Sequence, residues 1–79
     1  MTTILRTTHK GHTISAHFEK PCRHEGKPAH RWFVFVQANS RGYPFSCGQM
    51  TAPQTAGIDE VEAAALAHAI KTDPALFVN

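Results

Sequence analysis

The chain has 79 residues and a formal net charge of +2, which allow one domain spanning residues 1–79 and no more. Hydrophobic residues make up 42% of it, so it is too apolar and too weakly charged to be disordered. No apolar run reaches the ~18–20 residues of a membrane span, and the N-terminus lacks the apolar core of a signal peptide. We therefore expect a small soluble domain in the cytoplasm that makes no membrane contact.

Charge is distributed unevenly along the chain. Residues 1–48 carry seven Lys or Arg against two acids, a net charge of +5, whereas residues 49–79 carry one lysine against four acids, a net charge of −3. This asymmetry predicts a dipolar molecule with a charged partner. A sheet with basic loops, followed by a helix with an acidic start, is the alternative explanation of the same pattern.

The N-terminal part of the sequence predicts a β-hairpin. Thr3 to about Thr8 is short and rich in Thr, Ile and Leu, and His12 to Glu19 alternates apolar and polar residues, as a half-buried strand does. Lys10-Gly11 supplies a two-residue turn between them. This turn pairs Leu5 with Ala16 and Thr7 with Ile14.

The strongest strand signal is Arg31 to Val36, which is apolar on both faces and therefore predicts a central strand. Its alternation places Trp32, Val34 and Val36 on one side, and Phe33 and Phe35 on the other. Before it, Lys20 to Ala29 is predicted to be a basic loop, because it contains three chain breakers: Pro21, Gly26 and Pro28.

After a turn at Asn39 to Gly42, Tyr43 to about Gly48 predicts a fourth strand with Tyr43, Phe45 and Cys47 on one face. Pro44 cannot donate a ladder hydrogen bond, so this strand is expected at an edge of the sheet. Met50 to Gly57 is predicted to be a second loop.

A helix is predicted from Asp59, with Asp59 as its N-cap and Glu62 reaching back to it, and Thr72-Asp73-Pro74 is expected to end it. Beyond that point, the sequence is compatible with one extra helical turn capped by Asp73 or with a short edge strand from Leu76 to Val78. The helical spacing gives the inward face as Val61, Ala65, Leu66, Ala69 and Ile70.

These elements predict an α+β domain in the order ββββα, an antiparallel sheet of three to four strands built from two hairpins, with one C-terminal helix on one face. One helix covers one face only, so the aromatic residues on the other face either lie under loops or form a binding or dimer surface. The sequence does not say which face the helix takes. The predicted core is Leu5, Ile14, Ala16, Phe18, Trp32, Val34, Val36, Phe45, Val61, Ala65, Leu66, Ala69 and Ile70.

Arg31, Phe33, Phe35 and Val36 resemble the strand signature of RNA-recognition motifs, in which a basic residue precedes alternating aromatic residues. Trp32 and Val34 stand where that family has small residues, and that family has a helix between its first two strands, so the chain is not assigned to it. The order of strands followed by a helix also looks like that of small three-stranded DNA-binding domains. Both resemblances imply aromatic residues that stack on bases and cations that hold phosphates.

For function, we expect a non-enzymatic protein that acts by protein–protein contact, with nucleic-acid binding as the alternative and a homodimer as a further one. In size, simple topology and lack of motifs the chain looks like small proteins carried by phages and mobile elements, such as anti-CRISPR inhibitors. The predicted partner-binding residues are basic or aromatic: Lys20, Arg23, Lys27, Arg31, Phe33, Phe35 and Arg41.

Metal binding and catalysis are weakly supported by the sequence. Cys22, His24 and His30, with Cys47 as a fourth ligand, are a residual zinc hypothesis, but their spacing matches no common paired-ligand pattern. No nucleophile and base stand at a recognisable catalytic spacing, and the phosphate-binding glycine motifs are absent. We therefore expect no catalytic residue, no cofactor and no metal.

Overall fold

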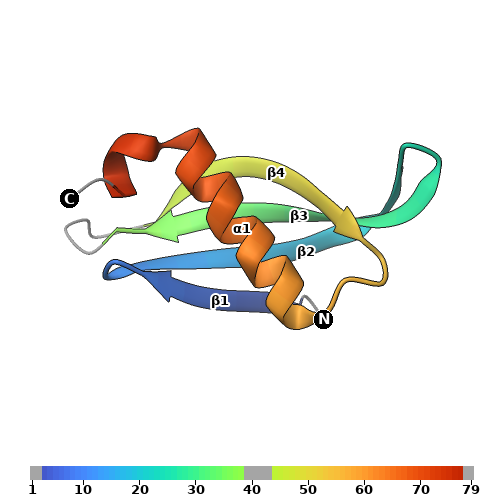
Figure 1. Cartoon of the computed structure of the whole chain (residues 1–79), viewed down its shortest axis with the longest axis horizontal. Coiled ribbons are helices and arrows are strands. Elements are labelled where there is room, and N and C mark those ends of the chain that lie inside the picture. Colours follow the sequence, from blue (N-terminus) through green and yellow to red (C-terminus); the bar gives the residue numbers. More distant parts are fainter. Residues whose placement is uncertain (1–2, 39–43, 78–79) are drawn as a thin grey trace.

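Four antiparallel strands form a meander, and one helix lies across it (Figure 1). The structure is a computed structural model that describes residues 3–38 and 44–77. Its elements are β1 (Ile4–His9), β2 (His12–His24), β3 (Lys27–Gln37), β4 (Phe45–Pro53), α1 (Ile58–Thr72) and a short 3-10 helix, η1 (Pro74–Phe77). Each strand pairs with its neighbour in sequence, in the order β1-β2-β3-β4. The predicted α+β class and ββββα order are confirmed, and none of the described helices is long and apolar enough to cross a membrane.

The hairpin of β1 and β2 turns at Lys10 and Gly11, whose φ angles are both positive, 52° and 81°. Two successive residues with positive φ twist the chain in the sense that a two-residue hairpin requires. Leu5 lies opposite Ala16, and Thr7 lies opposite Ile14. The predicted turn and register are therefore both confirmed.

The loop predicted over Lys20–Ala29 is wrong. β2 continues to His24, and β3 begins at Lys27. Only Glu25 and Gly26 form the turn, again with positive φ angles, 53° and 78°. Of the three chain breakers, only Gly26 lies in the turn, whereas Pro21 and Pro28 lie within β2 and β3. The turn is the tip of a long hairpin that projects beyond the rest of the sheet (Figure 1).

The two prolines of this hairpin are tolerated because each lies past the end of a neighbouring strand. β1 pairs with β2 only as far as His17, so Pro21 lies on a free edge, where no ladder needs its missing N–H group. Pro28 lies one residue before Ala29, at which the pairing between β3 and β4 ends. Strand breakers therefore mark the projecting part of the hairpin without ending its strands.

The fourth strand is longer than predicted. β4 runs to Pro53, so the loop predicted over Met50–Gly57 is wrong in its first half. β4 lies at the edge of the sheet, as Pro44 predicted. The predicted turn at Asn39–Gly42, and Tyr43 with it, lie outside the described residues.

A β-bulge at Gly48 explains why the sequence pattern hid the second half of β4. Phe33 lies opposite Gln49 but Phe35 lies opposite Ser46, so β4 has one extra residue here. Gly48 has a φ of 84°, a left-handed conformation that favours glycine. The extra residue shifts the alternation, so that Cys47 and Met50, three positions apart, are both buried.

The N-cap of the helix lies two residues earlier in the chain than predicted. Gly57 is its N-cap and makes no side-chain cap bond, so the prediction of Asp59 as N-cap is wrong. Asp59 and Glu60 lie in the first turn, where they complement the positive end of the helix dipole. α1 ends at Thr72 as predicted, and the extra helical turn, η1, is present rather than an edge strand.

The core lies between α1 and one face of the sheet, the face that carries Trp32, Val34 and Val36. Most of the predicted core residues are buried, and five are partly buried against the core: Leu5, Phe18, Phe45, Leu66 and Ile70. Residues beyond the end of the predicted fourth strand complete the core, together with the short C-terminal helix. They are Met50, Ala52 and Phe77, joined by Cys47.

Candidate functional site

The face of the sheet opposite α1 is the candidate site, and we call it the open face. Its residues follow from the alternation along each strand and from the cross-strand pairs. Phe33 and Phe35 lie near its centre and are half-buried. The open face comprises Ile4, Arg6, Thr8, Thr13, Ser15, His17, Lys20, Arg31, Phe33, Phe35, Gln37, Ser46, Gln49 and Thr51.

Three cations lie on the open face. Arg6 projects from β1, and Lys20 and Arg31 are direct cross-strand neighbours on β2 and β3. Glu19, at the irregularity between Phe18 and Lys20, brings one carboxylate to this face, where it accepts a hydrogen bond of 3.2 Å from Nε2 of Gln49. The cations therefore outnumber the acid three to one.

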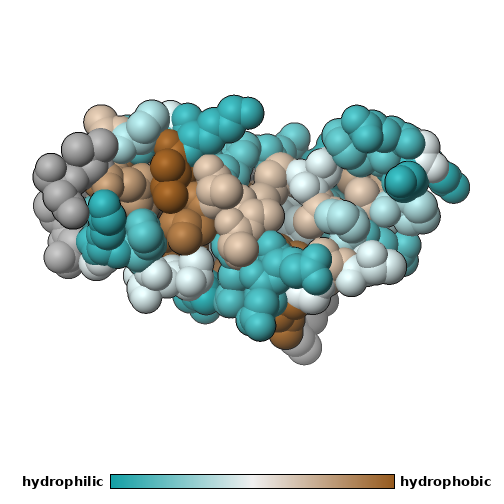
Figure 2. All heavy atoms as spheres, in the orientation of Figure 1, coloured by the Kyte–Doolittle hydropathy of each residue, from teal (hydrophilic) through white to brown (hydrophobic). Residues whose placement is uncertain are grey.

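The other side of the molecule has the opposite charge balance. Four of the six acidic residues of the chain lie on α1 or at its C-cap, with Lys71 as the one basic residue of that segment. Figure 2 views this side, on which hydrophilic residues lie over the projecting hairpin and near the ends of the helix, with apolar residues between them. The sheet thus separates a basic face from an acidic one. The four acids are Asp59, Glu60, Glu62 and Asp73.

The rings of Phe33 and Phe35 on the open face are only partly exposed to solvent. His17 packs against Phe35 in a T-shaped arrangement, with ring centroids 4.8 Å apart. Nε2 of His17 also lies 3.2 Å from Oγ of Ser15, within hydrogen-bonding distance. Trp32 is on the helix side and only 6% exposed. Partly covered rings between polar side chains suit a mixed polar and aromatic contact better than a purely apolar one.

A shallow hollow of about 470 Å³ lies in the open face. We call it the Phe35 hollow, because Phe35 supplies its aromatic surface. The other lining side chains offer a guanidinium group, hydroxyl groups, an imidazole and an amide. The lining residues are Arg6, Thr13, Ser15, His17, Phe35, Gln37 and Pro44.

Four of the predicted partner-binding residues come together on the open face, namely Lys20, Arg31, Phe33 and Phe35. Two other predicted residues, Arg23 and Lys27, do not join them. Arg23 lies on the projecting hairpin, where its Nη1 donates a 3.2 Å hydrogen bond to the main-chain oxygen of Gly26, and Lys27 lies opposite His24 near the same tip. Arg41 lies outside the described residues.

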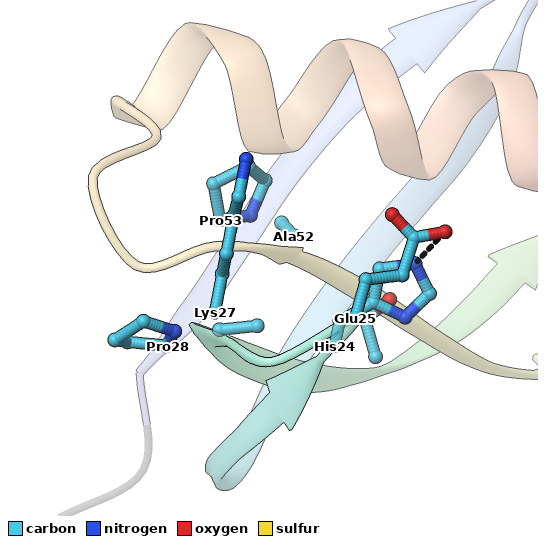
Figure 3. A pocket seen from close by; sticks show the side chains of 8 residues that line it. His24, Glu25, Lys27, Pro28, Ala52 and Pro53 are labelled. Atoms are coloured by element: carbon cyan, nitrogen blue, oxygen red, sulfur yellow. Dashed lines mark ion pairs between the residues drawn. The ribbon is translucent and has the colours of Figure 1, made fainter.

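A second hollow, of about 260 Å³, lies between the projecting hairpin and the end of β4, and we call it the hairpin hollow (Figure 3). Its apolar lining comes from two prolines and two alanines. At its rim, Nε2 of His24 and Oε1 of Glu25 are 4.0 Å apart, an exposed pair that adds little stability. The lining residues are His24, Glu25, Lys27, Pro28, Ala29, Thr51, Ala52 and Pro53.

The residues of the zinc hypothesis are not gathered. Cys22 lies opposite Ala29, and His30 lies opposite the adjacent residue Pro21, so their side chains leave opposite faces of the hairpin. The His30 ring instead packs edge-on against Phe18, with centroids 5.0 Å apart. Within residues 3–38 and 44–77, no three His, Cys, Asp or Glu side chains are grouped closely enough to hold a metal ion.

Cys47 does not have the properties of a reactive nucleophile. It is 6% exposed. Burial raises the pKa of its thiol above the ordinary value of 9.0, and the nearby Asp73 carboxylate raises it further. A thiol that keeps its proton at neutral pH reacts slowly, because the thiolate is the nucleophilic form.

Sequence reasoning missed Arg6 and His17 as site residues, although a signal for both was present. The predicted pairing of Leu5 with Ala16 places Arg6 opposite Ser15, and the alternation of β2 places Ser15 and His17 on the polar side. That polar side turns out to be the open face. The missing information was the side of the sheet on which α1 packs.

Comparisons of the chain with protein-family models, with curated proteins and with solved structures found no match.

Proposed function

We propose that this chain is a non-enzymatic module that binds nucleic acid through the open face. The observation that supports this most is the separation of charge across the sheet. Arg6, Lys20 and Arg31 lie on one side, and most of the acidic residues lie on the other. A polyanion is attracted to the first side and repelled from the second, so the charge arrangement orients it on the sheet.

The uncharged side chains of the open face are also suited to this partner. Hydroxyl and amide groups bond both to phosphate oxygens and to base edges. The half-buried rings of Phe33 and Phe35 offer limited apolar area, whereas a stable protein interface needs a well-desolvated apolar centre. The two cysteines, Cys22 and Cys47, are free, as in a reducing compartment, and we place this activity in the cytoplasm.

Salt dependence is the first test of the proposal. Three phosphate contacts predict that log K falls with log salt with a slope of about −2 for a single strand. The measurement is fluorescence anisotropy of a labelled oligonucleotide, titrated with the protein at a series of salt concentrations. An affinity that does not change with salt, or no binding at low salt, would contradict the proposal.

Charge-removing variants on the two sides of the sheet make a matched comparison. Arg6→Gln and Lys20→Gln each remove one cation of the open face, and each is expected to weaken binding about fivefold at ~0.1 M salt. Lys71→Gln removes the same charge from exposed α1 and is expected to leave binding unchanged. Equal losses in all three variants would show that net charge alone, and not the open face, governs binding.

A protein partner is the second candidate, and the hairpin hollow is the observation that favours it. Pro28, Ala29 and Ala52 line a small apolar concavity, and the opposite charges of Glu25 and Lys27 beside it offset each other. A hollow of this kind accepts a side chain of a protein more readily than a nucleic acid. An inhibitor of the anti-CRISPR type, which would act by protein–protein contact, belongs to this second candidate.

A pull-down from host lysate separates the two candidates. The unsubstituted chain and two variants each serve as bait, and the lysate is treated with nuclease. If a protein partner uses the hairpin hollow, Pro53→Asp, at an exposed lining residue, abolishes recovery of a defined protein and Arg6→Gln does not. If the open face and nucleic acid carry the function, nuclease treatment abolishes recovery with the unsubstituted chain. Sedimentation of the purified protein tests the homodimer alternative separately.

A further inference from the structure

The Phe35 hollow combines the features that a single nucleobase requires. Phe35 supplies a half-buried aromatic surface, on which a base of any identity can stack. Gln37 adds an amide, whose Nε2 donates a 3.5 Å hydrogen bond to the main-chain oxygen of Ala38, and Thr13 adds a hydroxyl that can bond to a base edge. Arg6 at the rim carries the positive charge that a neighbouring phosphate needs.

The size of the hollow fits a small planar group. Its volume of about 470 Å³ falls within the range of small-molecule pockets, ~300–1,000 Å³. A base inside a duplex is stacked between its neighbours and exposes only its edge. A base can occupy this hollow only if it is unstacked, which a single strand allows at little cost.

The other cations continue the site along the sheet. Arg31 is four residues from Phe35 on β3, roughly 14 Å away along the strand, and Lys20 is its cross-strand neighbour. A nucleic-acid strand with one base in the Phe35 hollow can therefore place its phosphates beside Lys20 and Arg31, a few nucleotides further along. Single-strand sites of this kind cover about 4–16 nucleotides.

The width of the sheet disfavours a duplex. Four strands about 4.8 Å apart span roughly 14 Å, whereas the major groove of B-form DNA is ~12 Å wide. The open face therefore does not fit flat into a groove of a regular duplex, and a duplex laid across it touches the cations with its backbone but leaves the Phe35 hollow empty.

From these observations we infer that the open face binds single-stranded nucleic acid in preference to duplex, with one unstacked base in the Phe35 hollow. This inference rests on the proposed nucleic-acid function and specifies its ligand. Single-stranded DNA and RNA share this chemistry, so oligothymidylate and oligouridylate serve as separate probes.

The test uses three labelled DNA probes of about twelve nucleotides, a length within the range of single-strand sites. They are oligothymidylate, the same strand annealed to oligoadenylate, and an abasic strand of equal length. The unsubstituted protein is expected to bind oligothymidylate at least about fivefold more tightly than either other probe. A fivefold difference corresponds to the lower end of the free energy of one base–aromatic stacking contact. Because this comparison needs no variant, it does not depend on how well a substituted protein folds.

Two matched substitutions then locate the base. Phe35→Leu and Phe45→Leu both replace a partly buried ring of the sheet with an aliphatic side chain, but Phe35 lines the hollow whereas Phe45 packs against the core on the helix side. Phe35→Leu is expected to lose at least about fivefold in affinity for oligothymidylate, with affinity for the abasic strand unchanged. Phe45→Leu is expected to change neither by more than about twofold.

The possible outcomes separate the inference from the function on which it rests. Equal affinity for the abasic strand and oligothymidylate, or tighter binding of the duplex, overturns the inference. If Arg6→Gln still weakens binding in that case, the nucleic-acid function stands without it. If no probe binds at low salt, the proposed function itself fails.

Discussion

His68 on α1 donates a 2.8 Å hydrogen bond from Nε2 to the main-chain oxygen of Cys47 in β4. This bond joins the helix to the edge strand beside the Gly48 bulge. The main-chain oxygen of His68 in turn accepts a 2.8 Å bond from Oγ1 of Thr72. Because a main-chain oxygen can only accept, Nε2 of His68 carries the hydrogen of this bond and is the ring nitrogen that faces β4.

Removal of this helix-to-strand bond is expected to destabilise the domain. His68→Leu keeps a side chain of similar bulk but leaves the oxygen of Cys47 without its His68 donor, which costs about 1–2 kcal/mol of unfolding free energy. Urea denaturation followed by circular dichroism measures the loss. His24→Ala, at the exposed hairpin tip, is the control and is expected to change stability by less than about 0.5 kcal/mol. Equal losses in the two variants would mean that the bond to Cys47 contributes nothing specific.

The bulge predicts a backbone effect at Gly48. A Cβ atom at this position would meet no heavy atom within 4 Å, so any cost of a substitution comes from its φ of 84° and not from a clash. Gly48→Ala is expected to lose about 1–2 kcal/mol. Gly48→Asn should lose less, since asparagine tolerates positive φ better than alanine. The order of the two midpoints in thermal unfolding checks this, and an alanine variant as stable as the unsubstituted chain would contradict the left-handed conformation.

Phe77 of η1 is expected to be essential to the fold. It is 6% exposed, and its ring lies beside those of His9 and His12, at centroid distances of 6.0 and 5.5 Å. Phe77→Ala is expected to cost about 3 kcal/mol or more. A domain of this size has only a few kcal/mol of stability, so the variant should be largely unfolded at 37 °C, as measured by circular dichroism.

The backbone of Phe77 provides a milder version of the same test. Nζ of Lys10 donates a 2.9 Å hydrogen bond to its main-chain oxygen. Lys10→Met keeps the aliphatic stem but removes this bond, and the expected loss is about 0.5–1 kcal/mol. A loss as large as that of Phe77→Ala would show that the lysine does more than hold the end of the chain.

The buried thiol of Cys47 predicts a loss of stability at alkaline pH. Its pKa is raised above the ordinary value of 9.0, so the folded state keeps a proton that the unfolded state releases. The resulting stabilisation is complete below pH 9.0 and declines as the pH rises above that value toward the folded pKa. Urea unfolding at about pH 7.5 and about pH 10 measures the decline, which should be smaller in Cys47→Ala. An equal decline in both proteins would contradict it.

The same burial predicts a difference in reactivity between the two cysteines. Cys22 is partly exposed and Cys47 is buried. Alkylation of the native protein, followed by mass spectrometry, should therefore show one thiol that reacts quickly and one that reacts only as the domain unfolds. Cys22→Ala should remove the fast reaction, and a fast reaction that survives in this variant would place Cys47 at the surface.

Local sequence preferences account for the hairpin turns and the strand alternation of this structure. Turn residues such as Lys10-Gly11 carry their own backbone preference, so the first hairpin and its register could be predicted. The alternation of Arg31–Val36 likewise predicted that Trp32 and Phe33 lie on opposite faces of the sheet, because successive side chains of a strand point to opposite faces. These features depend on neighbours in the chain, and the structure confirms them.

Only the tertiary structure decided which of the two faces α1 covers, because both sides of β3 are apolar and either could form the core. The bulge at Gly48 also escaped prediction, since an extra residue in one strand is defined only by its pairing with another. The candidate site depends on both kinds of information. Arg6, Lys20 and Arg31 are far apart in the sequence and share one face only because β1, β2 and β3 lie side by side and the helix packs on the other side.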